Sequence, residues 1–278
     1  MFIDTHLHLI DQSKLAYPWL SGAGELNRDF TYAEYALEAR RLGIEAALHM
    51  EVDVATSDIE VETEMVRSLA ASQGDLISGV IAACRPEETG FPAYLEKCGA
   101  DPFVKGFRRV LHVVPDDISE QVLFRDNLKR MAASRLTFDI CMLARQQPLA
   151  IALIDSAPGV RFVLDHCGVP DIVSGDFDGW KRGISEIAKR PNVSAKVSGI
   201  VAYADPQAWT VETIRPYAEH VVSSFGWDRV VWGSDWPICR LGGGLSTWVG
   251  ATQAIFASCS ADEREKLYRG NARRIWNL

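Results

Sequence analysis

Two histidines near the N-terminus are spaced so that they could bind one metal ion together. His6 and His8 flank Leu7 at the end of the apolar segment 2–6. If that segment is a β-strand, alternate side chains share a face, so both imidazoles point one way and Leu7 points the other. Imidazole nitrogens are common ligands of zinc. The alternative is a polar pair that only ends a strand, and the spacing alone leaves it open.

Two further polar groups follow apolar segments later in the chain. His166 comes directly after segment 160–165, and Asp235 comes two residues after segment 229–233. Each also has a structural interpretation, because His166 could donate a hydrogen bond that closes a loop and Asp235 could form a turn. If both groups lie beside the first histidine pair, they would add a nitrogen and a carboxylate oxygen to the same site.

Such a group of side chains suits hydrolysis of a carbonyl compound. We predict that His6, His8, His166 and Asp235 bind a metal ion, and that Asp235 and His166 are catalytic. A bound divalent ion can lower the pKa of water to about 7 and polarise a carbonyl. Asp235 could take a proton from water as general base and return it to the leaving group as general acid. His166 would orient the water or the carbonyl.

Five other residues are candidates for substrate contact. Lys105 and Arg108 follow the start of an apolar segment, and cations at the end of a strand would suit an oxyanion or a carboxylate. His112 follows in the same stretch. Trp19 and Trp236 could stack on a sugar face. The alternatives are ion pairs at the rim for the cations and a purely space-filling role for the tryptophans.

Three charged residues have no single interpretation. Glu51 could be a further metal ligand, a substrate contact or a solvated loop acid. Arg85 could contact substrate or form an ion pair at the rim. Lys196 alternates with Val197 and could therefore face the interior of a barrel, where a structural ion pair is the alternative to a catalytic role.

The elements that must position these residues are eight short, mostly apolar segments that alternate with helical segments. They predict a single-domain (β/α)8 TIM barrel over residues 1–278. An open doubly wound sheet is the alternative, but no G-x-G-x-x-G sequence follows a strand here. In a barrel the strand ends share one face, which would bring the polar groups together. The segments are 2–6, 44–50, 76–83, 104–107, 136–142, 160–165, 193–197 and 229–233.

The helical segments carry recognisable end signals. Capping boxes are predicted at Thr31–Glu34 and at Ser260–Glu263. Gly43 is expected to end the first of these helices, and Gly74 is expected to follow a helix over 58–73.

Composition narrows the possible partners. The formal net charge is -8, so a phosphate backbone or an anionic bilayer is not expected as the main partner. The charge does not say which small-molecule substrate binds, because a site can carry the opposite sign locally. No apolar run approaches the roughly 18 residues of a membrane span, and no basic and hydrophobic leader begins the chain, so we expect a cytoplasmic protein. The six cysteines include no C-x-x-C pair and are expected to be reduced. The sequence leaves open whether the protein is a homo-oligomer.

Several motifs, in this order along the chain, resemble a known family. They are similar to those of the amidohydrolase-2 group of the amidohydrolase superfamily, and more narrowly to its sugar-lactone hydrolases, the branch of L-fuconolactonase and L-rhamnonolactonase. The matching stretches are His6–His8, Leu164–Gly168, Lys196–Gly199 and Gly233–Pro237, with Tyr17–Leu20 and Gly106–His112 in support.

The resemblance implies a hydrolase that opens a small lactone, in which Asp235 is the general acid/base. It implies either one divalent metal ion, for which zinc is the first choice, or no metal ion, because members of the branch vary in metal dependence. Asp139 stands where a histidine would be needed for a binuclear centre. The alternative on the same scaffold is a metal-dependent decarboxylase or a lactone isomerase. The chain departs from its relatives at Leu9–Ile10, where an aromatic residue usually follows the histidine pair, so the resemblance does not identify the sugar.

Overall fold

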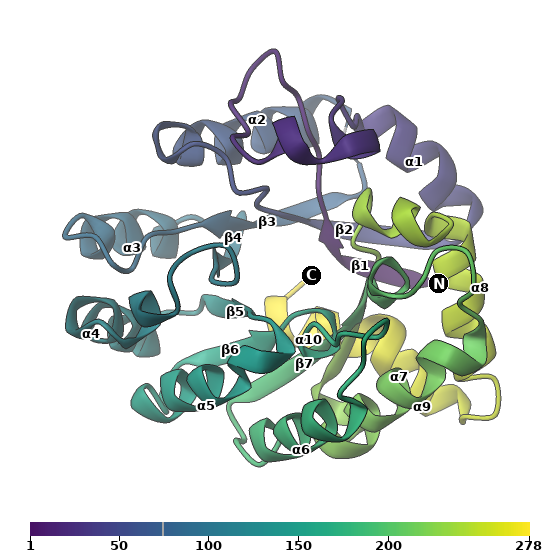
Figure 1. The fold of residues 1–278 in the computed structure, drawn as a ribbon. Coiled ribbons are helices and arrows are strands. Elements are labelled where there is room, and N and C mark those ends of the chain that lie inside the picture. The colour runs from purple at the N-terminus through teal and green to yellow at the C-terminus, as the bar shows by residue number, and fades with distance from the viewer. Residues whose placement is uncertain (74) are drawn as a thin grey trace.

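Eight parallel strands form one sheet whose spatial order is the order of the chain (Figure 1). The computed structural model describes residues 1–73 and 75–278. Each strand lies on one of the eight predicted segments. Their bounds are β1 Phe2–Leu7, β2 Ile44–Met50, β3 Ile77–Ala83, β4 Val104–Val110, β5 Thr137–Cys141, β6 Arg161–Leu164, β7 Val193–Ser198 and β8 Val230–Gly233.

Strand β4 is three residues longer than predicted. The apolar pattern stops at Phe107, but the strand runs on to Val110 through two arginines. Both guanidinium groups are buried in ion pairs, Arg108 with Glu51 and Arg109 with Glu87. A buried and paired charge is compatible with a strand that is covered on both faces, and the hydrophobic pattern does not reveal such a pair.

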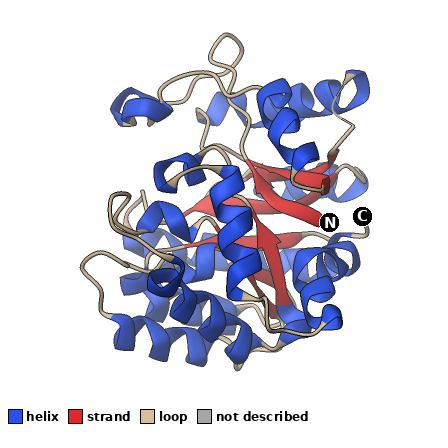
Figure 2. Cartoon of the chain, turned by 90° about the vertical axis from the view of Figure 1, so that its right-hand side faces the viewer, coloured by secondary structure: helices blue, strands red, loops and turns tan. Residues whose placement is uncertain are grey.

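Backbone hydrogen bonds between the last strand and the first close the barrel. The Asp235 amide donates to the carbonyl of His6 at 2.8 Å, and the His8 amide donates to the carbonyl of Trp236 at 2.7 Å. The sheet therefore curls into a ring, with the strands in the middle and helices outside (Figure 2). The predicted single-domain (β/α)8 TIM barrel is confirmed. The closing bonds are made by the backbone of four predicted site residues, so closure also brings their backbones together.

The helices that cover the strands begin and end near the predicted signals. Thr31 Oγ1 accepts from the Glu34 amide, and Ser260 and Glu263 form the predicted capping box. Gly43 has a left-handed φ of 74° just after the first helix, whereas Gly74 lies outside the described residues. The helices are α1 Tyr32–Arg41, α2 Ile59–Ser72, α3 Phe91–Ala100, α4 Val122–Arg130, α5 Gln147–Ser156, α6 Phe177–Ile187, α7 Val211–Phe225, α8 Leu245–Ile255, α9 Ala261–Glu265 and α10 Asn271–Trp276.

The interior of the barrel has an apolar layer and a polar layer. The apolar layer is a separate cluster of inward side chains from β1, β2, β3, β6 and β8, to which α10 adds Trp276. This last helix lies across the barrel axis in Figure 1. The Trp276 indole donates to Thr137 Oγ1 at 3.0 Å, at the start of β5. One end of the barrel is thus filled, and the polar groups lie toward the other end, where the strands finish.

Strand β5 illustrates how the alternation sorts these layers. Phe138 is buried and packs on Phe124 of α4, so it faces outward. Thr137, Asp139 and Cys141 alternate with it and face inward.

No helix in the described part of the chain is long and apolar enough to cross a membrane.

Candidate active site

The ends of β1 and β8 bring three of the four predicted metal ligands together. His8 Nε2 lies 3.4 Å from Asp235 Oδ1, and His6 Nε2 lies 3.7 Å from the same oxygen. The two imidazole centroids are 4.9 Å apart. The three side chains are buried, and one ligand atom from each lies within 4.8 Å of the others. Both histidines therefore point the same way, as the strand alternation predicts.

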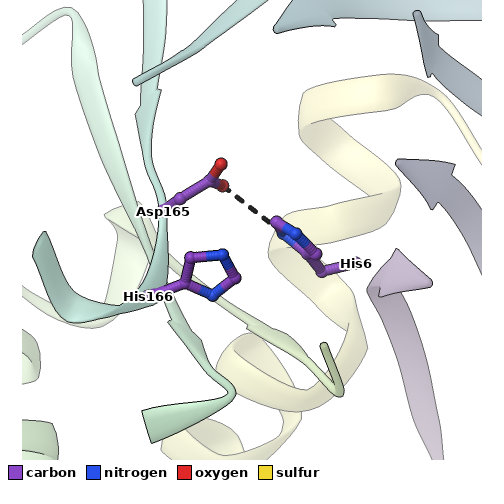
Figure 3. Close-up of side chains that lie close together, drawn as sticks. All are labelled: His6, Asp165 and His166. Carbon is purple, nitrogen blue, oxygen red and sulfur yellow. Dashed lines mark ion pairs between the residues drawn. The ribbon is translucent and has the colours of Figure 1, made fainter. Parts of the chain in front are cut away.

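The fourth predicted ligand, His166, lies against the same cluster and is accompanied by Asp165. The His166 ring is 4.3 Å from the His6 ring, and its Nδ1 is 3.7 Å from Asp235 Oδ2. Asp165 Oδ1 lies 3.5 Å from His6 Nδ1 (Figure 3). His6 is therefore shared, with one ring nitrogen facing Asp235 and the other facing Asp165.

A buried lysine balances the negative charge under His6. Lys196 of β7 forms ion pairs with Asp139 and with Asp165, the second at 3.1 Å, and its Nζ lies 3.4 Å from His6 Nδ1. The side chains of the three charged residues are fully buried. The sequence predicted a structural ion pair in the barrel interior as one of two interpretations of Lys196, and this ion pair is present. Because the charges are buried, each one needs its partners to remain ionised.

Arg108 is held so that one nitrogen points at His6. Its Nε donates to Glu51 Oε1 at 2.6 Å and its Nη2 donates to the Glu51 carbonyl at 2.7 Å. The remaining nitrogen, Nη1, lies 3.2 Å from His6 Nε2 and 3.6 Å from Asp165 Oδ2. Burial alone would raise the pKa of Glu51, but the Arg108 guanidinium holds it below its ordinary value. Glu51 thus fixes the cation rather than being a solvated loop acid.

Burial also sets the protonation of the central groups. It raises the pKa of Asp235 to about 6, although His166 and Arg108 favour the carboxylate. Burial and the Arg108 charge lower the pKa of His8 to about 3, and burial holds the pKa of His6 well below its ordinary value. Neutral imidazoles can accept hydrogen bonds or bind metal, and a carboxyl group that titrates near pH 6 can exchange protons at neutral pH.

Two of the site residues have a strained backbone. His166 and Asp235 have φ values of 50° and 57°, in the left-handed region, which costs roughly 1–2 kcal/mol for a residue other than glycine. Gly199 faces Asp235, and a Cβ placed on it would lie 2.4 Å from Asp235 Oδ2. Only glycine leaves room for the carboxylate there, which explains the glycine that ends the Lys196–Gly199 motif.

The arrangement fits one divalent ion. His6, His8 and Asp235 offer two neutral nitrogens and a carboxylate oxygen within bonding reach of a common point, and these are ligand types that zinc accepts. Among the described residues, Asp235 Oδ2 is buried without a hydrogen-bond partner. Arg108 Nη1 approaches the same His6 nitrogen, so a protein cation already supplies positive charge at this point.

Besides Arg108, two of the predicted substrate contacts lie near this centre. The Trp19 indole donates to the Val52 carbonyl at 2.8 Å, one residue beyond Glu51, and is partly exposed. His112 follows β4 and is also partly exposed. Burial and the charge of Arg108 lower the pKa of His112. The ring therefore lies close enough to the site to interact with the Arg108 guanidinium.

Trp236 and Lys105, which are also predicted substrate contacts, lie away from this centre. Trp236 is fully buried, and its ring lies 5.5 Å from the rings of Phe30 and Tyr35, because the loop after β8 turns Asp235 inward and the indole outward. Lys105 is the second residue of β4, and its side chain packs over Gly79. Lys105 and Arg108 are three residues apart, so their side chains point to opposite faces of β4. Lys105 also lies near the start of the strand, away from the end where Arg108 lies.

Two further residues near the site, Asp165 and Tyr203, were missed, and Arg85 forms an ion pair at the rim. Arg85 lies 3.6 Å from Asp53 in an ion pair, as the alternative interpretation allowed. Asp165 immediately precedes His166 and lies two residues after Val163, which faces inward. Because residues two apart share a face of a strand, strand alternation could have identified Asp165 as an inward residue. Tyr203, whose ring is 5.9 Å from that of His166, lies in an irregular segment without a pattern. Cys141 ends β5, and its position at a predicted strand end is the signal that places it near the site.

Comparisons with known proteins agree with this geometry. A family model described as amidohydrolase matches residues 3–278. The chain is 32% identical over 215 residues to L-fucono-1,5-lactonase of Burkholderia ambifaria, which covers 75% of this chain and 73% of that protein. It is similar to the solved structure of an amidohydrolase from Burkholderia multivorans with bound zinc, with a TM-score of 0.88 and 25% identity over 100% of this chain and 99% of the other.

A more distant likeness shows the fold alone. The structure of 2,6-dihydroxybenzoate decarboxylase from Rhizobium is similar with a TM-score of 0.64 and 14% identity, over 100% of this chain and 98% of that one. The motif resemblance is confirmed by the family match over nearly the whole length. From the barrel, the histidine pair and that match, we conclude that the chain belongs to the amidohydrolase family.

Proposed function

We propose that the protein hydrolyses a small lactone of a sugar acid. The observation that carries this proposal is the convergence of His6 and His8 on one oxygen of Asp235, at 3.7 and 3.4 Å. The lactonase relative at 32% identity supports the lactone as substrate class. A small organic ester also suits a buried centre better than a polymer would.

Asp235 carries the proton transfers in this proposal. Its carboxylate takes a proton from water as the water attacks the ring carbonyl, and the carboxyl group then protonates the departing ring oxygen. A pKa of about 6 favours both steps near neutral pH, because neither form is strongly preferred. His166, 3.7 Å from Asp235, orients the water or the carbonyl.

Positive charge at the centre stabilises the oxyanion that forms on the carbonyl. Arg108 Nη1 is the protein group placed for this, since Glu51 holds the other guanidinium nitrogens. His6, His8, His166 and Asp235 would hold a divalent ion, for which we propose zinc, and the bound ion would polarise the carbonyl. The zinc-bound relative supports the choice of metal.

The test is a screen of aldonolactones with a pH indicator, using metal-replete and chelated protein, followed by mass spectrometry of the product. We expect acid release and a product heavier by one water. Loss of carbon dioxide would instead identify a decarboxylase, and an unchanged mass would identify an isomerase.

Asp235→Asn tests the assigned role. We expect kcat to fall by about 100- to 10,000-fold, the usual contribution of a general acid/base. Asp178→Asn is the matched control, because this aspartate is exposed on α6. If Asp235→Asn turned over the lactone as fast as the control variant, Asp235 would not be the general acid/base.

A further inference from the structure

A cysteine and a histidine that the proposed mechanism does not use lie in contact beside the site. Cys141 is the last residue of β5 and faces inward, two residues after Asp139. Its Sγ lies 3.3 Å from Nδ1 of His112, which follows β4. The contact joins two neighbouring strands at the end of the barrel where the catalytic groups lie.

Both groups are uncharged near neutral pH. Burial raises the pKa of the Cys141 thiol far above its ordinary value. Burial and the Arg108 guanidinium lower the pKa of His112. In a neutral pair, the thiol is a weak donor and a poor acceptor, whereas an unprotonated imidazole nitrogen is a good acceptor. The S–H group therefore donates to Nδ1, and the ring proton resides on Nε2.

The two residues differ in exposure. Cys141 is 3% exposed, and its Sγ is in contact with the His112 ring. His112 is partly exposed. The charges of Arg108, Asp165 and Glu51 all influence His112, so the ring lies beside the reaction centre. The charged groups around His112 are already paired with one another. The neutral N–H group of His112 is therefore suited to donate a hydrogen bond to a neutral oxygen of the substrate.

We propose that Cys141 positions His112 so that its Nε2–H binds one hydroxyl group of the sugar lactone. This inference rests on the proposed function, because it requires a polyhydroxylated lactone as substrate. His112 is the specificity-determining residue, and Cys141 is a positioning residue that acts through it. The pair selects a lactone with a hydroxyl group at one ring or side-chain position over the matching deoxy compound.

The kinetic test compares lactones that differ by one hydroxyl group. L-Galactono-1,5-lactone and L-fucono-1,5-lactone form one such pair, and 2-deoxy and 3-deoxy aldonolactones extend the panel. We expect Cys141→Ala and His112→Ala each to lower kcat/KM about tenfold on the fully hydroxylated lactone, the effect of one lost hydrogen bond. On one deoxy compound, neither variant should lose anything relative to the wild type, since the contacted group is already absent.

Two further variants separate positioning from folding. Cys141→Ser keeps a donor to Nδ1 and should restore most of kcat/KM. Cys98→Ala removes a buried cysteine on α3, away from the site, and should match the wild type. Equal losses from Cys141→Ala on every lactone of the panel, hydroxylated or deoxy, would show a merely structural role and overturn the inference.

Nitrogen NMR of 15N-histidine-labelled protein tests the pair without any turnover. We expect the Nε2–H tautomer of His112 in the wild type and in Cys141→Ser, and a mixture of tautomers in Cys141→Ala. An Nδ1–H tautomer in the wild type would overturn the pair. If the wild type hydrolyses no lactone of the panel, the proposed function fails and the hydroxyl contact fails with it. If the wild type is active and both alanine variants match it on every lactone, only this inference fails.

Discussion

At the scale of single residues, the geometry of Arg108 is specific to arginine. Its three nitrogens bind the Glu51 carboxylate, the Glu51 carbonyl and His6 in one plane. Lysine has one nitrogen and cannot make these contacts together. We expect Arg108→Lys to lower kcat/KM by about 100-fold, as for the loss of one oxyanion donor. Arg145→Lys, which changes an exposed arginine paired with Asp116, is the control. Equal steady-state kinetics for the two variants would contradict the role of Arg108.

The raised pKa of Asp235 predicts a pH dependence of activity. The carboxylate form is needed to accept the proton from water, and the ionised fraction falls as the pH drops through about 6. We therefore expect kcat/KM of chelated protein to decrease about tenfold per pH unit below that value and to level off above it. Chelated protein is used because a cation beside Asp235 would lower its pKa. A profile that stays flat down to pH 4.5 would contradict this assignment.

At the scale of elements, the ends of three neighbouring strands are joined by a buried ion pair network. Lys196 of β7 binds Asp139 of β5 and Asp165 beyond β6. Lys196→Met would leave two carboxylates buried without their cation, so we expect the free energy of unfolding to fall by about 3–5 kcal/mol. Urea denaturation measures this. Lys189→Met, which changes an exposed lysine on a surface ion pair, should change stability by less than about 1 kcal/mol. A similar denaturation midpoint for both variants would show that the network adds little.

At the scale of the whole molecule, barrel closure forms the proposed metal site, so metal binding should stabilise the fold. Ligands from β1 and from the loop after β8 come together only in the closed barrel. A zinc concentration 100 times its Kd should therefore add about 2.7 kcal/mol to the free energy of unfolding. We expect thermal denaturation of chelated protein to show this shift, and His8→Asn to abolish it. His220→Asn, on the outer helix α7, is the control and should keep it. A shift that survived in His8→Asn would place the zinc elsewhere.

The sequence by itself determined the elements and pointed to the residues of the proposed site. All eight strands lie on segments visible from apolar runs. The capping box at Ser260–Glu263 forms where local spacing placed it, whereas at Thr31 only the N-cap bond from the Glu34 amide forms, because the Glu34 carboxylate pairs with Arg28. These features are set by interactions within a few residues. The common face of His6 and His8 follows from strand alternation in the same way. The meeting of these histidines with Asp235 followed once the barrel was assumed, since parallel strands finish on one face.

Only the tertiary structure decided which polar side chains face inward and what charges surround them. Trp236 turns outward although Asp235 beside it turns inward, and Lys105 lies near the opposite end of β4 from Arg108. Lys196 pairs with Asp165 and Asp139, which precede it by 31 and 57 positions in the numbering of the chain. Orientation depends on the register between strands and on the packing of helices. The pKa of Asp235 depends on burial and on charges from distant segments, and no local pattern in the sequence encodes these.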